Sequence, residues 1–481
     1  MISPNSESRP TDLPTAVRAL VLTLLFGCVS AAESRIDGMV PASPAAQIRE
    51  EVRTPPAPAQ DPAVLAQLAG GGTVSLAQLI GFALRNSPAT RATWADARAA
   101  AAAAGSKQSG YFPQIDALGG YEYRHQVFSQ TATFAYKDWN AGVQLSWLLL
   151  DAGTRGADVA EARALLAAAN LNHDATVQDL VLRVEQAYAQ YQGARALYAA
   201  QKASVAEART AFEAADERRR TGVATIADVL QAKTALSQAQ LNLQTLDGQV
   251  QTLRGAVATA VGVPANVPVE AEELPQVDIE RQLARIEDLI GQAQRERPDL
   301  LRARMQEEAA KSHAQSVRAR GWPQLFLTGN ASALAFIVPG YPVGNSYGGA
   351  LQLRWSIFTG FRDSFDAAQA EEQAKAAAAR SESVEQQAIL SVWSSYQAVR
   401  TAVQRVRTAR DLLSSAKQSA DVAEGRYKEG VGNILDVLTA QSALAGARAQ
   451  EIQARADWQL SVASLAHDTG ALGPAAPGEQ K

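Results

Sequence analysis

The chain has 481 residues, a formal net charge of −4 and an ordinary apolar fraction, but only 6% aromatic residues and abundant alanine. This balance is typical of long helices rather than of a packed α/β enzyme, and nothing in it indicates a nucleic-acid partner. A single cysteine, Cys28, excludes an internal disulfide framework and a cysteine-based zinc site.

Residues 1–32 are interpreted as an export signal, because arginines precede a short apolar run and small residues follow it. Two readings of its cleavage stay open. Residues 25–28, Leu-Phe-Gly-Cys, resemble a bacterial lipobox, which would leave Cys28 lipidated at the mature N-terminus, although Phe26 fits poorly. The alternative is cleavage after Ala31 or Ala32. That the only cysteine lies at this place favours lipidation. After the signal, no apolar run reaches the roughly 18 residues of a transmembrane helix.

Residues 33–73 are rich in Pro and Ala and predict an extended lead-in. Order is expected from about residue 74. Ser75 is a plausible N-cap for one helix, and a second helix should run from Pro88 to about Ser109, before a Gly-Tyr-Phe-Pro stop signal.

Two strands are predicted next, at about residues 114–124 and 140–150. Apolar residues alternate with polar ones in both runs, which is the pattern of a sheet with unlike faces. Each run is long enough for a tilted strand to cross a bilayer. The polar segment between them, residues 124–138, predicts an exposed loop.

A long helix is predicted from Arg155 to about Arg219, because this stretch contains no proline. Large apolar residues recur every seven positions, among them Val184, Tyr191 and Tyr198, and mostly alanine lines a second seam. A strict heptad predicts supercoiled packing, and the alanine seam is expected to need helices from neighbouring copies of the chain. The helix breaks at a tip near residues 220–225, and a returning helix completes a hairpin.

The second half repeats the first. Pro88 and Pro298 are 210 residues apart, and Trp147 and Trp355 are 208 apart. We therefore predict repeat 1 at 74–263, a linker at 264–278, and repeat 2 at 279–468. The strands of repeat 2 are expected at 324–335 and 347–358, its tip near 428–433, and a disordered tail at 469–481.

Each repeat supplies two strands, so the chain has four, and a closed barrel takes at least about eight. Lipid does not tolerate open sheet edges, so several copies are required. The predicted fold is mixed and mainly α, with helical hairpins and strands contributed to a shared barrel.

The chain resembles the TolC family of Gram-negative outer-membrane channel proteins over about residues 74–466. The resemblance rests on the repeated Gly-x-Pro-Gln before a strand, the Leu-x-Asp-Ala-Gly turn, and the paired tip motifs at residues 218–230 and 426–438. It implies a homotrimer with a twelve-stranded transmembrane β-barrel and an α-helical periplasmic tunnel. It also implies an outer-membrane exit duct that works with a periplasmic adaptor (membrane fusion) protein and an inner-membrane RND or ABC transporter, in efflux or type I secretion.

Three tip residues match positions that narrow the tunnel in this family: Asp228, Asp436 and Tyr427. The family resemblance and the ring of like charge that three copies of Asp436 would form both suggest an aperture, whereas the alternative is that the aspartates cap or solvate the returning helices. The sequence departs from the pattern at Gly432, where some members carry an arginine, and at Thr439.

Other residues at the tips and strand ends carry two readings each. Gly222 and Gly430 are interpreted as turn residues, with binding residues as the alternative. The run Arg218, Arg219 and Arg220 is either a solvated helix end or an adaptor contact. Trp147 and Trp355 are interpreted as membrane-interface anchors, with packing between protomers as the alternative.

No enzyme, cofactor or metal site is predicted. The four histidines lack metal-ligand spacing, and no P-loop or nucleophile elbow occurs. The alternative function is a periplasmic coiled-coil adaptor of an export complex, which should have one hairpin and no ten-residue alternating strands.

Overall fold

The computed structural model describes residues 38–40, 73–129, 132–272, 284–337 and 343–472. The predicted export signal with Cys28, and most of the lead-in, lie outside these ranges. Two compact units divide the chain. Of the described residues, one unit contains 38–40, 95–129, 132–170, 305–337 and 343–379, and the other contains 73–94, 171–272, 284–304 and 380–472.

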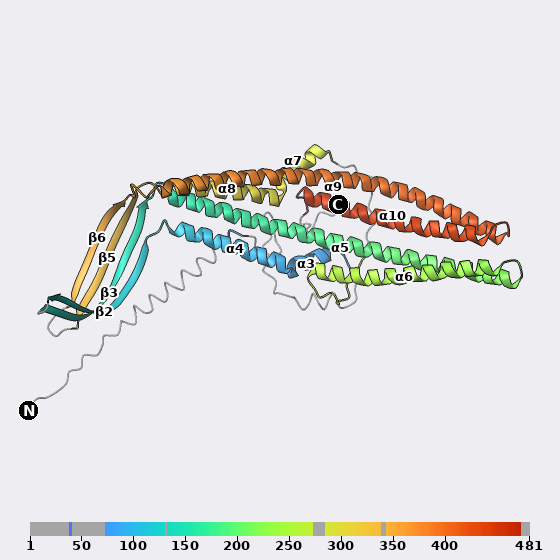
Figure 1. The fold of residues 1–481 in the computed structure, drawn as a ribbon, viewed down its shortest axis with the longest axis horizontal. Helices are drawn as coiled ribbons and strands as arrows, with labels where there is room; N and C mark the ends of the chain where they lie inside the picture. The colour runs from blue at the N-terminus through green and yellow to red at the C-terminus, as the bar shows by residue number, and fades with distance from the viewer. Residues whose placement is uncertain (1–37, 41–72, 130–131, 273–283, 338–342, 473–481) are drawn as a thin grey trace, which may run out of the picture. The chain divides into compact units, whose positions relative to one another are not determined.

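The first unit contains a four-stranded sheet in the order β2-β3-β5-β6. Its strands are Gln114–Ser129, Ala132–Leu150, Gln324–Phe336 and Gly344–Arg354, and every neighbouring pair is antiparallel (Figure 1). The sheet therefore joins the two sequence halves through the β3–β5 pair.

The exposed loop predicted at residues 124–138 is wrong. The ladder between β2 and β3 continues from Glu122↔Asp138 to Ser129↔Ala132. A ladder needs only paired backbone groups, so it extends beyond the stretch in which apolar and polar side chains alternate. The last strand ends earlier than predicted. It is expected to reach residue 358, but β6 ends at Arg354.

The helices follow the predicted order in both halves. Before the sheet strands come α3 (Leu76–Asn86) with α4 (Pro88–Ser109), and α7 (Ile286–Glu296) with α8 (Pro298–Ala319). After them come α5 (Thr154–Arg220) with α6 (Ile226–Val261), and α9 (Arg362–Lys428) with α10 (Ile434–Asp468). Matching helices have 11 and 11, 22 and 22, 67 and 67, and 36 and 35 residues. Among the described residues, none of these helices has both the length and the apolar character required to cross a bilayer.

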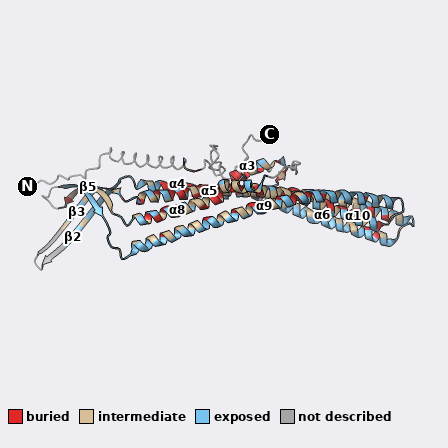
Figure 2. Ribbon diagram, turned by 90° about the horizontal axis from the view of Figure 1, so that it is seen from above, coloured by how far each residue is buried: buried red, intermediate tan, exposed pale blue. Residues whose placement is uncertain are grey.

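The alanine seams are buried within a single chain, so the expectation that they need another copy is wrong. On α9, Ala416 and Ala420 pack with Leu444 of α10, and Ala409 packs near Ala454 of the same helix. On α5, Ala215 packs with Val229 and Ala232 of the returning helix α6. Figure 2 shows buried residues along these helices. The apolar and alanine heptad positions are thus buried by packing between the two helices of each hairpin.

The largest core of the second unit surrounds Val177, Val184 and Tyr191 of α5, which join residues of α3, α6 and the short parallel pair β1 (Thr73–Val74) and β4 (Glu270–Ala271). Tyr191 is therefore a packing residue, as the sequence predicts, and Tyr198 is half-buried. The tail predicted as disordered from residue 469 is ordered at its start, because Thr469 and Leu472 are buried. Residues 473–481 lie outside the described residues.

Candidate channel wall and hairpin tips

The four-stranded sheet has one apolar and one polar face. Strand register places Ala117 opposite Val143, Val143 opposite Ala331, and Ala331 opposite Tyr347. Directly paired residues project on the same side of a sheet, so one face carries the odd-numbered residues of all four strands. They include Ile115, Tyr121, Leu145, Trp147, Leu325, Leu327, Leu351 and Leu353. The opposite face carries Asp116, Gln144, Thr328, Asn330 and Gln352.

The apolar face is exposed in the single chain. Ile115, Leu351 and Leu353 are 68%, 63% and 69% exposed. A contiguous exposed apolar face of this kind marks contact with a membrane or another protein.

Aromatic residues occur at two levels of this face. Trp139 pairs with Tyr121, and Trp147 lies eight residues further along β3. That separation is about 27 Å along the strand, at ~3.4 Å per residue. Because strands of a barrel are tilted, the height between these two levels along the membrane normal is smaller. It approaches the roughly 25 Å of an outer-membrane apolar band with aromatic girdles.

Both predicted interface tryptophans hold a helix–strand junction. The indole Nε1 of Trp147 donates to the carbonyl of Tyr111 at 3.0 Å, and that of Trp355 donates to the carbonyl of Gly321 at 3.2 Å. Trp147 lies near the end of β3 and Trp355 directly follows β6, so each bond links the end of one strand to the turn that leads into the neighbouring strand. Trp147 is half-buried and Trp355 is 55% exposed.

The sequence did not predict a cluster of polar contacts around Arg155 at the first of these helix–strand junctions. Arg155 Nε lies 3.0 Å from Asp151 Oδ2, and its Nη1 donates to the carbonyls of Leu148 and Gly110 at 2.6 and 3.0 Å. The guanidinium also stacks on the Tyr111 ring, 4.9 Å from its centroid. The signal was present as an Asp–Arg pair spaced i, i+4 directly after a strand.

The two hairpin tips have the same backbone geometry. At the first, Val223 N–H donates to the Arg218 carbonyl and Gly222 N–H to the Arg219 carbonyl. At the second, Val431 N–H donates to the Arg426 carbonyl and Gly430 N–H to the Tyr427 carbonyl. This is the Schellman arrangement, which needs a left-handed residue. Gly222 has φ +81° and Gly430 has φ +80°, so the glycines supply the turns.

The two aspartates that follow the tips differ in their partners. Asp228 closes a capping box with Thr225, because its Oδ2 accepts from the Thr225 N–H at 2.7 Å and from the hydroxyl at 2.9 Å. Asp436 uses only its own N–H, which donates to Asn433 Oδ1 at 2.8 Å. Its carboxylate is exposed and has no partner among the described residues. Asp228 is thus a helix cap, whereas the Asp436 carboxylate takes no part in capping.

Tyr427, the third predicted aperture residue, is buried in the tip core with Ala215, Val229 and Ile434. The Arg218 guanidinium lies 4.2 Å from the centroid of its ring, and Arg218 Nη2 donates to the Lys428 carbonyl at 3.2 Å. Arg218 therefore joins the two hairpin tips within one chain. The Tyr427 hydroxyl is buried without a hydrogen-bond partner among the described residues.

A family model described as outer membrane efflux protein matches residues 79–263 and 289–471, which is well over half of the chain. The chain belongs to the outer membrane efflux protein family. It is an outer-membrane exit duct for efflux that extends into the periplasm.

Relatives agree with this assignment. The chain is 28% identical over 414 residues to protein CyaE of Bordetella pertussis, covering 83% of this chain and 85% of that protein. It is 26% identical over 421 residues to outer membrane protein TolC of Vibrio cholerae, covering 83% and 91%.

Solved structures show the same fold. The outer-membrane channel OprN matches with a TM-score of 0.75 at 19% identity, covering 89% of this chain and 99% of that one. The outer membrane protein VceC of Vibrio cholerae matches with a TM-score of 0.73 at 22% identity, covering 82% and 96%. The fold and the family are those of channel proteins rather than enzymes.

In this family member the other arginines of the first tip pair locally. Arg219 lies 3.2 Å from Asp216, and Arg220 lies 2.7 Å from the same carboxylate. Both side chains remain exposed, Arg220 at 66%. They are available to a partner, whereas Arg218 is engaged in the tip core.

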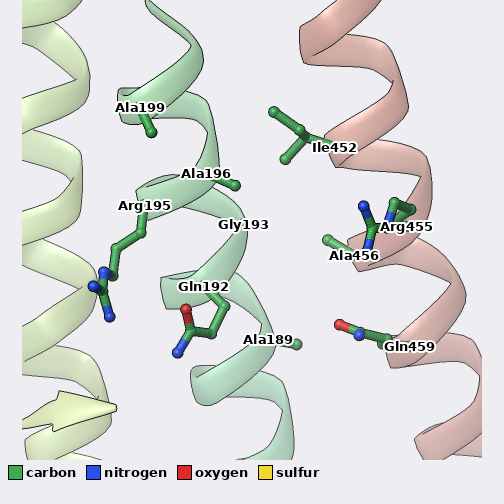
Figure 3. Close-up of a pocket in the computed structure, with 10 residues that line it drawn as sticks. All are labelled: Ala189, Gln192, Gly193, Arg195, Ala196, Ala199, Ile452, Arg455, Ala456 and Gln459. Atoms are coloured by element: carbon green, nitrogen blue, oxygen red, sulfur yellow. The ribbon is translucent and has the colours of Figure 1, made fainter. Parts of the chain in front are cut away.

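A small cavity of about 320 Å³ lies between α5 and α10 and is drawn in Figure 3. Two of its polar side chains are engaged in contacts with the chain at β4: Gln192 donates to the Glu272 carbonyl at 2.6 Å, and Arg195, which leaves α5 on the side away from α10, donates to the Ala271 carbonyl at 2.9 Å. The cavity thus lies beside the contacts that hold β4. Within the described residues, no group of three or more His, Cys, Asp or Glu side chains is placed to hold a metal ion.

The end of α10 is held to α5 by an ionic contact that the sequence did not reveal. His467 Nε2 lies 2.9 Å from Asp179 Oδ1, and its Nδ1 lies 3.3 Å from Asp468 Oδ1. The hydrogen bonds to Asp179 and then to Asp468 raise the pKa of His467 to about 9. The same bond to His467 lowers the pKa of Asp179. His467 is therefore an imidazolium at neutral pH.

Proposed function

We propose that three copies of the chain form one conduit, a twelve-stranded transmembrane β-barrel continued by a helical periplasmic tunnel. The observation that carries this proposal is the sheet itself. Its order leaves β2 and β6 each paired on one side only in the described part of the chain, and one of its faces is apolar and exposed. Such edges persist in lipid only if neighbouring copies pair with them.

The exposed faces of the tunnel helices support the same assembly. Along α6, the residues Leu230, Thr234, Leu241 and Thr245 share one uncharged stripe, with both leucines more than half exposed. Along α9, Leu390, Trp393, Leu412 and Val422 are large apolar residues that stay exposed in the single chain. Uncharged exposed stripes with helical spacing suit packing against another helix. We assign them to contacts between copies.

An internal duplication accounts for this architecture. Residues 74–263 and 279–468 form the proposed repeats, joined by the linker at 264–278 and followed by residues 469–481. The equal helix lengths and the shared tip geometry support the duplication. Six strand pairs in three copies then surround one pore.

Asp436 is proposed to line the periplasmic aperture. Three free carboxylates around a narrow axis attract cations, and water-exposed oxygens are available to bind them. Asp228 is engaged in its capping box, so we propose a smaller effect for it, and for Tyr427 a role in holding the tip rather than in touching solutes.

The proposed partners are a periplasmic adaptor protein and an inner-membrane RND or ABC transporter, which would supply the energy that a passive duct lacks. Family membership supports an adaptor and a transporter in general, and the choice between transporter classes stays open. The exposed pair Arg219 and Arg220 beside the first tip is the proposed adaptor contact. Adaptor capture should fall for the double variant Arg219→Glu/Arg220→Glu, and an unchanged yield would reject this contact.

The N-terminal segment and the junction tryptophans are proposed to add membrane contacts. For Cys28 we propose lipidation: metabolic labelling with palmitate should be lost in Cys28→Ala, and continued labelling would rule it out. Trp147 and Trp355 are proposed to lie at the membrane interface beside the helices.

Conductance tests the proposed function as a whole. Purified protein added to a planar lipid bilayer should produce stepwise conducting pores, and outer-membrane fractions should contain it. A protein that fractionates with the soluble periplasm and forms no pores would instead match the alternative, a periplasmic coiled-coil adaptor.

A further inference from the structure

The junction between β6 and α9 exposes aromatic side chains that its counterpart in the first half lacks. Phe358, Phe361 and Phe365 are 74%, 66% and 73% exposed. Residues 208 positions earlier are Leu150, Gly153 and Ala157. We name the three phenylalanines the junction patch.

The junction patch continues the apolar face of the sheet. Leu351 and Leu353 project from β6 on that face, and Trp355 and Ile357, 55% and 83% exposed, follow beyond the strand end. Phe358 comes directly next. The row of exposed apolar residues therefore leaves the strand and extends into the first turn of α9.

Phe361 has a strained backbone. Its φ is +66°, a left-handed conformation that is uncommon for a bulky residue. Gly153 has the corresponding conformation in the first half, with φ +93°. The Phe361 ring packs edge-on against Phe358, with centroids 5.6 Å apart, and otherwise remains exposed. A contact outside the chain would explain why an aromatic residue stands here.

We propose that the junction patch inserts into the headgroup region of the periplasmic leaflet of the outer membrane and anchors each copy there. Phospholipid fits better than a protein partner for two reasons. The patch is continuous with the sheet face assigned to lipid, and Arg362, whose side chain is 71% exposed and whose Nε lies 3.5 Å from Asp363 Oδ1, sits between Phe361 and Phe365. Aromatic rings with a neighbouring cation suit the membrane interface, where the guanidinium meets lipid phosphate. This inference rests on the proposed assignment of the apolar sheet face to lipid.

Photo-crosslinking in whole cells tests the anchor with the full chain. The photoreactive phenylalanine analogue p-benzoylphenylalanine replaces Phe358 or Phe365, and phospholipid is labelled with radioactive phosphate. Leu351 serves as the position on the apolar sheet face, Gln352 as the polar-face control, and Ala157 as the matched position in the first half. We expect lipid adducts at Phe358 and Phe365 within about twofold of Leu351, and at least about fivefold above Gln352 and Ala157.

Three results would overturn the anchor. An adduct to a second copy or to another protein at Phe365 would assign the patch to a protein interface. No adduct at Phe358 and Phe365, with a lipid adduct at Leu351, would reject the anchor but leave the lipid-facing sheet intact. No lipid adduct at Leu351 either would reject both.

A second variant keeps the test decisive if the analogue disturbs folding. Phe365→Ser should leave the oligomer intact in detergent, because it removes a lipid contact only. Dissociation of the oligomer by Phe365→Ser would show a contact between copies and contradict the anchor.

Discussion

The guanidinium of Arg218 lies 4.2 Å from the ring centroid of Tyr427, so residues from two different hairpins form the same tip core. The ring is buried, and Arg218 adds a hydrogen bond to the Lys428 carbonyl. This pair ties the α5 end to the α9 end without the arginine that some family members carry at the position of Gly432.

Removing this pair should loosen the tips. A cation–π contact of this kind is worth about 1 kcal/mol, so Arg218→Ala should speed amide exchange at Val223 and Val431 about fivefold. Hydrogen exchange measured by mass spectrometry checks this. Arg219→Ala is the matched control and should change exchange less than twofold. Equal effects of the two variants would mean that the stacking contributes nothing.

The same substitution should act oppositely at two glycines near the second tip. Gly430→Ala forces a side chain into φ +80° and should cost about 1 kcal/mol. Gly425 is an exposed position within α9, and Gly425→Ala should stabilise the protein by about 0.5–1 kcal/mol. Thermal unfolding of the two variants gives the comparison. A gain in stability for Gly430→Ala would contradict the Schellman turn.

Substitutions at Asp436 and Asp228 should have different effects, the first on channel block and the second on stability. Asp436→Asn should raise the concentration of a trivalent cation needed to block the channel about tenfold, because three carboxylates are lost from one ring. Asp228→Asn should change block less than threefold but cost about 1 kcal/mol of stability through its capping box. Single-channel recordings with matched thermal melts resolve the two effects. Equal block of wild type and Asp436→Asn would remove Asp436 from the aperture.

Stability should depend on pH through His467. Its pKa is raised to about 9 from an ordinary value of 6.5, so the bond to Asp179 contributes fully below about pH 6.5 and is lost as pH rises through 9. The contribution is about 1 kcal/mol, below the usual range for a charge-assisted bond, because Asp179 is exposed and solvent screens the pair. Thermal melts between pH 6 and 9.5 should decline for the wild type, and His467→Gln should flatten part of that decline. An identical decline in the variant would show that His467 is not responsible.

Much of the fold follows from local patterns in the sequence. The absence of proline and the heptads predict α5 and its hairpin, and period-two alternation predicts the strands and their two faces. Repetition of these patterns places the tips at Gly222 and Gly430. The ends of β2 and β3 could not be predicted, because backbone pairing alone extends the ladder beyond the alternating side chains.

The contacts that connect distant parts of the chain were not predictable from local patterns. Arg218 meets Tyr427 across 209 residues, and His467 meets Asp179 across 288. The free carboxylate of Asp436 was also hidden, since its counterpart Asp228 occupies the same place in the tip motif. The difference arises because Asn433 stands at the N-cap where the first hairpin has Thr225.

The central claim is that separate copies close the barrel by pairing β2 of one copy with β6 of the next. Within one chain these strands are separated by two others, about 14 Å at ~4.8 Å per strand, so a shorter thiol crosslinker joins only different copies. Cysteines placed at Ala117 in β2 and Leu351 in β6, with each single variant as a control, should yield a ladder of covalent products in outer membranes. The account predicts that the ladder stops at three copies. A protein that remains monomeric, or a ladder that stops at two or continues beyond three, would contradict it.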